Sequence, residues 1–376
     1  MRTVIALLLA GLASGAAHAQ LFPAPRPDMT WDIDRVVLVE VLAGHRALAF
    51  KHPDPKLDFS IRGPKGAYDL RWAEGAAWAV TPPSEAHPEA AWELRQCVDR
   101  QSWIRVGHFP KAPDSPAQKA RVHPLSQGKF LLMCMEGPPF ELGDEASLFA
   151  LASPTSDGTF KVQSLVDLGL KSPMFTRERR GGRPTWTFNL KHLWLLNAVR
   201  NQPFLATPDG LVLGCFQIGA FFVLDGQGRL RRRLDVFPSL TDEMRADTST
   251  FEYVVLCAQP RADGKILLAT RSEDAVLHGR KLFPRDHSLA TSMDSRKAAE
   301  RDAFDRLSLS QFPQVLWWEL DPLEGVIRPA TPPQQVPTTL QDPAALRRYR
   351  FTFKPNGDLD FSPSGGRNPG AGGASR

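Results

Sequence analysis

From about residue 35 onward, the chain alternates short apolar runs with clusters of turn-forming residues. Runs of about four to eight residues that are rich in Val, Ile, Phe and Trp are typical of β-strands. Such runs are found at 35–41, 48–50, 68–72, 76–80, 91–94 and 103–109. Pairs such as Asp157-Gly158 and Asp225-Gly226 lie between runs of this kind, and the chain holds 28 Gly and 33 Pro, which favour tight turns. The pattern therefore predicts an all-β protein made of successive hairpins.

One strand-and-turn phrase recurs along the chain, and its clearest copy covers residues 208–237. There a Pro-Asp-Gly turn leads into the apolar run 211–216, a second apolar run follows at 220–224, and an Asp-Gly-Gln-Gly turn precedes the charged run 229–237. Related phrases begin at Pro124, Pro260 and Pro355. Apolar runs without alternation predict strands that are buried on both faces, whereas the charged run predicts a solvated strand. The phrase therefore indicates a sheet whose first strands are buried and whose last strand is exposed to solvent.

This order of a Pro-x-Gly turn, an apolar run and an Asp-x-x-Gly-x-x-Arg turn resembles the blades of β-propellers. The resemblance is to the irregular NHL, gluconolactonase-like and quinoprotein-like groups. It implies an all-β fold, a β-propeller of about five to seven four-stranded blades, which would form a single domain over residues 31–361. It identifies a blade and not one family, so no catalytic or cofactor residues are carried over with it.

The first residues have the pattern of a removable export signal. Arg2 supplies the positive end, residues 4–12 form an apolar stretch, and Ala17-His18-Ala19 is a small-x-small cleavage site. The apolar stretch is too short to cross a bilayer, which needs about 20 residues. We therefore expect residues 1–19 to be a signal peptide and the mature chain to be periplasmic or secreted, without a transmembrane span.

Four further segments depart from the strand pattern. Residues 20–30 are a Pro-rich lead-in without periodicity, and residues 362–376, rich in Gly, Pro and Ser, are expected to be a disordered tail. The charged run 294–310 predicts a short helical insertion. A second short helix is predicted at 342–348, because an Asp-Pro pair is a favourable helix start.

Composition and motifs exclude several classes of function. The formal net charge is +5, and the loss of Arg2 with the signal peptide makes it +4, so the charge gives no reason to expect a nucleic-acid partner. The chain has no Gly-x-Ser-x-Gly elbow, phosphate loop, dinucleotide fingerprint or His-Glu-x-x-His helix. Its histidines are scattered, and no pair has an obvious metal-ligand spacing. No catalytic constellation is therefore visible.

The cysteines suit an oxidising compartment but leave the disulfide state open. There are four of them, at positions Cys97, Cys134, Cys215 and Cys257. Two disulfides, in one of three pairings, and buried free thiols explain this pattern equally well. The absence of a Cys-x-x-Cys motif argues against a zinc or thiol-redox site.

The basic segment 176–186 is the sharpest local candidate for a binding site. Its candidate residues are Arg177, Arg179, Arg180, Arg183 and Trp186. Guanidinium groups beside an indole ring and two glycines could bind an anion or a sugar. The alternative is a solvated, mobile connector between blades. The similar cluster of arginines at 229–234 is interpreted as a polar outer strand, in which charge discourages edge-to-edge pairing.

The insertion from 273 to 312 is the second candidate, because long loops in compact domains often carry function. We expect it to cover one mouth of a central channel and to contribute to a ligand site. Its candidate ligand-binding residues are Asp274, His278, Arg285 and His287.

Two main functions remain open from the sequence. The first is an exported, non-enzymatic β-propeller that binds a protein, a small molecule or a saccharide on one face. The second is a metal-dependent hydrolase or lactonase of the propeller type, in which oxygen ligands hold Ca²⁺ in the channel. Glu252, Asn197 and Asp274, expected near the ends of inner strands, are its candidate ligands. A quinone-dependent dehydrogenase is a third alternative, but the regular Trp pattern expected around such a cofactor is missing.

Overall fold

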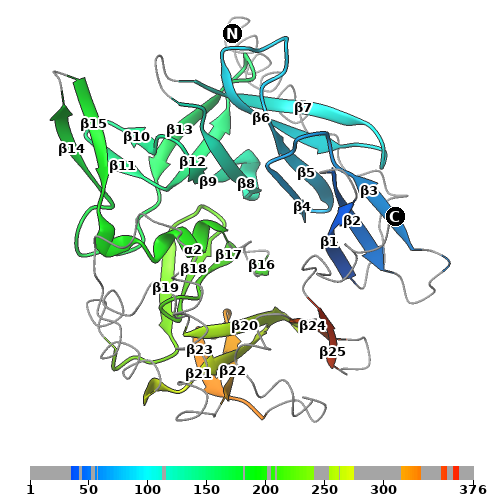
Figure 1. Ribbon diagram of the computed structural model, residues 1–376, viewed down its shortest axis with the longest axis vertical. Coiled ribbons are helices and arrows are strands. Elements are labelled where there is room, and N and C mark those ends of the chain that lie inside the picture. The colour runs from blue at the N-terminus through cyan, green and yellow to red at the C-terminus, as the bar shows by residue number, and fades with distance from the viewer. Residues whose placement is uncertain are drawn as a thin grey trace, which may run out of the picture. The chain divides into compact units, whose positions relative to one another are not determined.

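The protein is all-β and is built from several small antiparallel sheets, which confirms the all-β part of the predicted fold (Figure 1). The computed structural model describes residues 35–41, 45–51, 56, 58–111, 116–180, 183–200, 205–207, 210–240, 254–261, 263–274, 315–331, 349–353 and 359–363. The chain divides into two compact units. Unit 1 comprises Met1–Leu142 with Phe149–Leu165, and unit 2 comprises Gly143–Leu148 with Val166–Arg376.

Unit 1 contains three sheets whose strands follow each other along the chain. A three-stranded sheet consists of β1 (Arg35–Val41), β2 (His45–Lys51) and β3 (Phe59–Arg62). A four-stranded sheet consists, in order, of β4 (Asp69–Ala73), β5 (Ala76–Thr81), β6 (Ala90–Cys97) and β7 (Trp103–Pro110). The other four-stranded sheet consists, in order, of β8 (Lys119–Pro124), β9 (Phe130–Glu136), β12 (Phe149–Pro154) and β13 (Phe160–Leu165). A 3₁₀ turn, η3 (Ser126–Gly128), lies between β8 and β9, and β10 (Phe140–Leu142) follows β9.

Unit 2 repeats the four-stranded arrangement twice. One sheet consists, in order, of β16 (Leu205–Thr207), β17 (Gly210–Cys215), β18 (Ala220–Asp225) and β19 (Leu230–Asp235). The other consists, in order, of β20 (Val255–Pro260), β21 (Ile266–Arg271), β22 (Val315–Asp321) and β23 (Val326–Pro329). The remaining strands of the unit are β11 (Glu145–Ser147), β14 (Phe175–Arg180), β15 (Arg183–Phe188), β24 (Tyr349–Phe353) and β25 (Leu359–Pro363). The described helical turns are η4 (Leu190–His192) and the short helix α2 (Leu195–Arg200), which the sequence pattern did not predict.

The gradient predicted for the clearest copy of the phrase is confirmed. All six residues of β17 are buried, as are five of the six in β18, whereas β19 exposes Arg231 and Arg232. The turn between β18 and β19 forms as its chemistry requires, because the Asp225 carboxylate accepts hydrogen bonds from the amides of Gln227 and Arg229, both at 2.8 Å. β19 pairs only with β18, so it is the outer strand of its sheet.

The two four-stranded sheets of unit 1 share an aromatic core. The Trp92 ring is fully buried, stacks on Phe109 with centroids 5.1 Å apart, and lies 5.7 Å from Phe160. Its Nε1 donates a hydrogen bond to Oε1 of Gln118 at 3.1 Å, so the polar end of the indole is satisfied. The two sheets are therefore held together by side chains, in addition to an isolated backbone bridge between His108 and Thr159.

The three cysteine side chains that the structure describes are free thiols, so the two-disulfide alternative is wrong. Cys97 is half-buried, and Cys134 and Cys215 are buried. Burial raises the pKa of the Cys134 thiol to about 12 and also raises that of Cys215, so both stay protonated at neutral pH. The Sγ of Cys134 donates to the Pro138 carbonyl at 3.3 Å, as expected of a small buried residue with a weak donor.

Several predictions concern residues outside the described part of the chain. These are the signal peptide at 1–19, the lead-in at 20–30, the helices at 294–310 and 342–348, and residues 364–376 of the predicted tail. The first two residues of that tail, Ser362 and Pro363, instead end β25, where they pair with β24, so the predicted start of the tail is wrong. No helix among the described residues is long and apolar enough to cross a membrane.

Candidate functional site

The predicted basic segment 176–186 is a β-hairpin and not a connecting loop, which corrects that expectation. β14 and β15 pair in register, with Arg177 opposite Trp186 and Arg179 opposite Pro184. The Arg177 guanidinium lies 5.7 Å from the centroid of the Trp186 ring, and its Nη1 donates to the Asp144 carboxylate at 2.6 Å. Among the described side chains, the candidate anion or sugar site is thus an exposed Arg177 beside a half-buried Trp186, and the cation already has a carboxylate partner.

The insertion that begins at residue 273 is described only at its start. Asp274 is exposed and borders a hollow of about 570 Å³, which Glu273, Phe237 and Trp318 also line. His278, Arg285 and His287 lie outside the described residues, as does Glu252. Asn197 lies in α2, so its expected position at the end of an inner strand is wrong.

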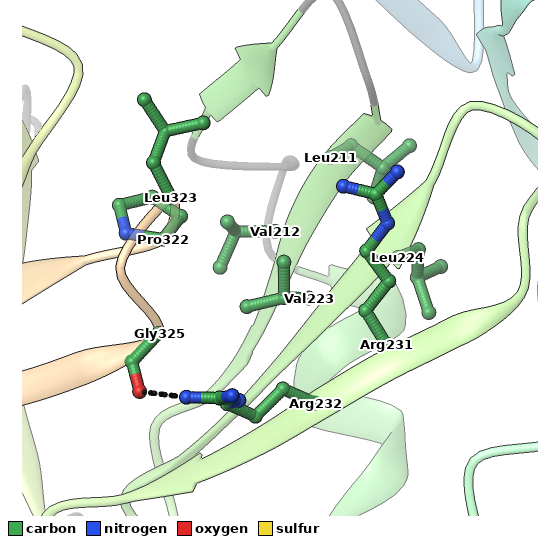
Figure 2. Close-up of a pocket in the computed structure, with 9 residues that line it drawn as sticks. All are labelled: Leu211, Val212, Val223, Leu224, Arg231, Arg232, Pro322, Leu323 and Gly325. Atoms are coloured by element: carbon green, nitrogen blue, oxygen red, sulfur yellow. Dashed lines mark hydrogen bonds between the residues drawn. The ribbon is translucent and has the colours of Figure 1, made fainter.

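The arginines of β19 have structural contacts, in agreement with the interpretation of this strand as a polar outer strand. Arg232 donates from Nη1 to the carbonyl oxygen of Gly325 at 2.8 Å (Figure 2). The same atom donates to the Glu324 carbonyl at 3.3 Å. Arg231 and Arg232 line a cavity of about 150 Å³ together with apolar side chains of β17 and β18 and the β22–β23 turn. This cavity is too small for a drug-sized ligand, for which pockets of about 300–1,000 Å³ are usual.

A cluster of buried charged groups in unit 1 is a stronger candidate than either predicted site. It consists of Arg46 on β2, Asp69 and Arg71 on β4, and Arg121 and His123 on β8. Residues two apart on a strand project to the same face, so β4 and β8 each present two polar groups to the cluster. β4 and β8 lie side by side as the first strands of their two sheets (Figure 1).

Asp69 is the centre of the cluster. The side chains of Asp69 and Arg71 are each only 4% exposed. The Asp69 carboxylate accepts from Nε of Arg71 at 2.8 Å and from Nη2 of the same guanidinium, and its Oδ1 lies 3.8 Å from Nε of Arg121. Arg46 donates from Nη1 to the Tyr68 carbonyl at 2.6 Å. Asp69 thus pairs with Arg71 and lies beside Arg121, while the Arg46 guanidinium is held by a backbone carbonyl.

The electrostatics of the cluster follow from burial. Burial, together with the neighbouring Arg71 charge, lowers the pKa of His123 to about 3, so its imidazole is neutral at pH 7. Nδ1 of His123 lies 3.5 Å from Nη1 of Arg71, where a neutral imidazole nitrogen can accept. Burial also lowers the pKa of Arg121; Asp69 opposes this effect, while the charges of Arg71 and Arg46 add to it. The described groups therefore form a cationic site beside a neutral imidazole.

Such an arrangement can bind an oxyanion. Guanidinium groups present donors in a planar fork that matches carboxylate, phosphate and sulfate oxygens. Sequence reasoning missed the cluster because it joins residues 46, 69, 71, 121 and 123 across three strands. A local signal was nevertheless present, since Asp69-x-Arg71 and Arg121-x-His123 place charged residues on one face of otherwise apolar runs.

We expect His123 alone to lower the free energy of unfolding by about 2 kcal/mol between pH 7.5 and pH 5. The unfolded chain binds a proton near the ordinary pKa of 6.5, whereas the folded chain binds it only near pH 3. The stabilising contribution is therefore complete above pH 6.5 and is lost progressively as the pH falls toward 3. Urea unfolding at the two pH values measures the difference. A His123→Asn variant keeps an acceptor for Arg71 and should show a smaller difference, and an unchanged difference would contradict this assignment.

The sequence analysis also missed a cluster of three potential metal ligands, because no two histidines have the sequence spacing of a typical metal site. The structure brings His87, Glu89 and His108 together, with one potential ligand atom of each within 4.8 Å of the others. The β6–β7 hairpin explains this, because Ala90 pairs with Pro110 and so places the loop before β6 beside the end of β7. A signal was nevertheless present in the sequence. His87-x-Glu89 comes directly before one apolar run, and His108 lies in the next apolar run, which pairs with the first as a hairpin.

Comparisons with known proteins assign no function. No model of a known protein family matches the chain, and no curated protein sequence matches it. A solved protein of unknown function from Bacteroides caccae is similar at a TM-score of 0.30 and 13% identity, over 80% of this chain and 81% of that one. A protein of unknown function from Dyadobacter fermentans DSM 18053 gives a TM-score of 0.28 and 12% identity over 65% of each chain. Similarities this weak carry no argument, so function must be inferred from the residues of the chain.

Proposed function

We propose that this chain is an exported β-propeller protein that binds an anionic ligand at the cluster of Arg46, Arg71, Arg121 and His123. The ligand would be a small molecule or a saccharide that bears a carboxylate, phosphate or sulfate group. The single observation that carries the proposal is one cluster of three guanidinium groups and one neutral imidazole, in which Asp69 pairs with Arg71 and lies beside Arg121.

The sheet pattern supports the propeller part of the proposal. Both units contain four-stranded antiparallel sheets whose strands are neighbours in the order of the chain, as in a propeller blade. A single propeller domain over residues 31–361 would place the first strands of successive blades around one channel. β4 and β8 are such first strands, so the cluster would line the wall of the channel. The export part rests on the signal-like pattern of residues 1–19.

Burial supports the binding part. Charged groups withdrawn from water are stable only when opposite charges and hydrogen bonds compensate them. The Arg121 side chain is 14% exposed, so it is less enclosed than the neighbouring Arg71 at 4%. An oxyanion that reached Arg121 would meet donors from different strands at once, and a low local dielectric would strengthen each contact.

The hydrolase alternative receives less support. Oxygen-only ligation of Ca²⁺ requires several carboxylate or carbonyl oxygens around one point. Within the described part of the chain, the one group of three potential His, Cys, Asp or Glu ligands contains two histidines and a single carboxylate. Of the proposed calcium ligands, only the exposed Asp274 has a described side chain, so the described residues supply no convergent set.

Thermal unfolding of the mature chain tests the binding of anions. Inorganic phosphate, sulfate and citrate, each at about 10 mM with EDTA and at constant ionic strength, would be compared with chloride. A ligand at about a hundred times its dissociation constant stabilises the folded state by about 2.7 kcal/mol, so we expect at least one anion to raise the melting temperature.

Two variants identify the site of that effect. Arg121→Gln removes a cluster guanidinium and should abolish the anion-dependent rise, whatever its own melting temperature. Arg105→Gln is the matched control, because Arg105 is an exposed arginine on β7. Arg105→Gln should show the same anion-dependent rise in melting temperature as the wild type. An equal rise in both variants would mean that the anions act through the bulk solvent and would overturn the proposal.

A further inference from the structure

We infer that His87, Glu89 and His108 form a binding site for a divalent transition-metal ion, with Zn²⁺ as the best match. This site shares no residue with the arginine cluster, so either proposal can fail while the other holds. His87 and Glu89 lie in the loop between β5 and β6, and His108 lies on β7 (Figure 1). All three belong to unit 1.

The distances fit one shared ion. Oε1 of Glu89 lies 3.0 Å from Nδ1 of His87 and 3.8 Å from Nε2 of His108. In a tetrahedral zinc site with bonds of about 2.0–2.1 Å, two ligand atoms are about 3.3 Å apart. The two measured separations lie on either side of that value. Because all three atoms are within 4.8 Å of one another, an ion would draw them together by about 1.5 Å at most.

The side chains can make this adjustment without disturbing the core. The imidazole rings of His87 and His108 are stacked, with centroids 4.7 Å apart and an interplanar angle of 20°. His87 is 26% exposed and Glu89 is 60% exposed, whereas His108 is only 10% exposed. One ligand is therefore held by the protein interior, and the other two close over it from the solvent side.

The backbone around the three side chains is well anchored. The amide of His108 donates to the Gly158 carbonyl at 2.9 Å, and the amide of Lys111 donates to the Glu89 carbonyl at 2.9 Å. Within the loop, the amide of His87 donates to the Ser84 carbonyl at 3.0 Å. Ser84 is held in turn by the buried Glu93, whose Oε1 accepts from the Ser84 amide at 2.9 Å. A loop fixed in this way positions ligands before the ion arrives, which favours binding.

His108 is the most enclosed of the three candidate ligands. Its Nε2 lies 3.8 Å from Oε1 of Glu89, beyond hydrogen-bond distance, so these two atoms face each other without a hydrogen bond between them. An ion between Nε2 and Glu89 would bridge this gap. The buried Nδ1 has no hydrogen-bond partner among the described residues, so no described contact dictates which ring nitrogen carries the proton.

The donor set selects the ion. Imidazole nitrogen suits zinc, copper and nickel, and two imidazoles with one carboxylate are a common ligand set for Zn²⁺. Three protein ligands leave one tetrahedral position open, which is the arrangement of zinc sites that bind an external molecule or water.

The test is a calorimetric titration of the untagged, EDTA-stripped mature protein with Zn²⁺ at pH 7.5. We expect one ion per chain with a dissociation constant in the micromolar range or below. His87→Ala and Glu89→Gln should each weaken binding at least about tenfold. Both residues are partly exposed, so these variants should fold, and their urea unfolding in EDTA should match that of the wild type.

Glu85→Gln is the matched control, because Glu85 is an exposed carboxylate of the same loop. It should bind Zn²⁺ with unchanged affinity. Replacing Zn²⁺ by Co²⁺ adds a spectroscopic readout, since a visible absorption band should appear in the wild type and disappear in His87→Ala. The proposal is overturned if the wild type does not bind Zn²⁺, or if His87→Ala binds it as tightly as the wild type does.

Discussion

Replacing Gly210 with alanine is expected to lower the free energy of unfolding by about 4 kcal/mol or more. Gly210 begins β17 with φ of +155°, a backbone conformation that favours glycine. A Cβ atom there would overlap the carbonyl oxygen of Leu224 and lie 2.7 Å from the carbonyl carbons of Leu224 and Asp225. These are backbone atoms of the paired strand β18, so the clash can be relieved only by separating the two strands. Urea unfolding monitored by tryptophan fluorescence measures the loss.

Gly264 provides the control because it holds the equivalent position in another copy of the phrase. Its φ is +80°, but a Cβ atom at Gly264 would meet nothing within 4 Å. Gly264→Ala should therefore lower the free energy of unfolding by only about 1–2 kcal/mol, the cost of placing alanine in a left-handed backbone conformation. The difference between the two variants isolates the strand contact. Equal losses would show that backbone conformation alone explains both glycines.

The same phrase shows why much of the fold could be predicted from the sequence. Its information is local, because turn residues and adjacent apolar runs specify hairpins without reference to distant residues. β17, β18 and β19 accordingly follow the predicted order, with a turn at Asp225 and an outer strand that exposes arginines. Strand type and burial gradient were therefore predictable.

The hairpin of β14 and β15 was misread for a physical reason. Four arginines and two adjacent glycines over residues 177–183 have the composition of a loop. The structure nevertheless pairs Phe175 with Phe188 and Arg177 with Trp186. Cross-strand aromatic contacts of this kind stabilise a hairpin, but they appear only once the register is known.

The candidate sites could not be predicted because each depends on contacts between strands. The arginine cluster forms where β2, β4 and β8 meet, and no spacing within one strand indicates which strands will be neighbours. The histidine pair depends on the register of one hairpin, in which Glu93 opposes His108. A shift of one residue would turn His108 to the other face of the sheet and remove the site.

Replacing Asp69 with alanine is the second substitution for which we expect a large effect, a loss of about 3–5 kcal/mol in the free energy of unfolding. The change removes the carboxylate that pairs with Arg71 and lies 3.8 Å from Nε of Arg121. The Arg71 side chain is only 4% exposed, so its charge would stay buried without that partner. Such a charge loses hydration without gaining compensation, which is more costly than the original pair. Urea unfolding in chloride buffer measures the effect.

Asp235 offers a matched control, because it forms an equivalent pair with an arginine two residues away on one strand. The side chains of Arg233 and Asp235 are 21% and 24% exposed, so water already screens their interaction. Asp235→Ala should therefore cost about 1 kcal/mol or less. If the cluster accepts an external anion, phosphate should restore part of the stability that Asp69→Ala loses, because it can replace the missing negative charge beside Arg71. Phosphate should not raise the free energy of unfolding of Asp235→Ala by more than it raises that of the wild type. A loss in Asp69→Ala that phosphate does not reduce would mean that the cluster is closed to ligands and only structural.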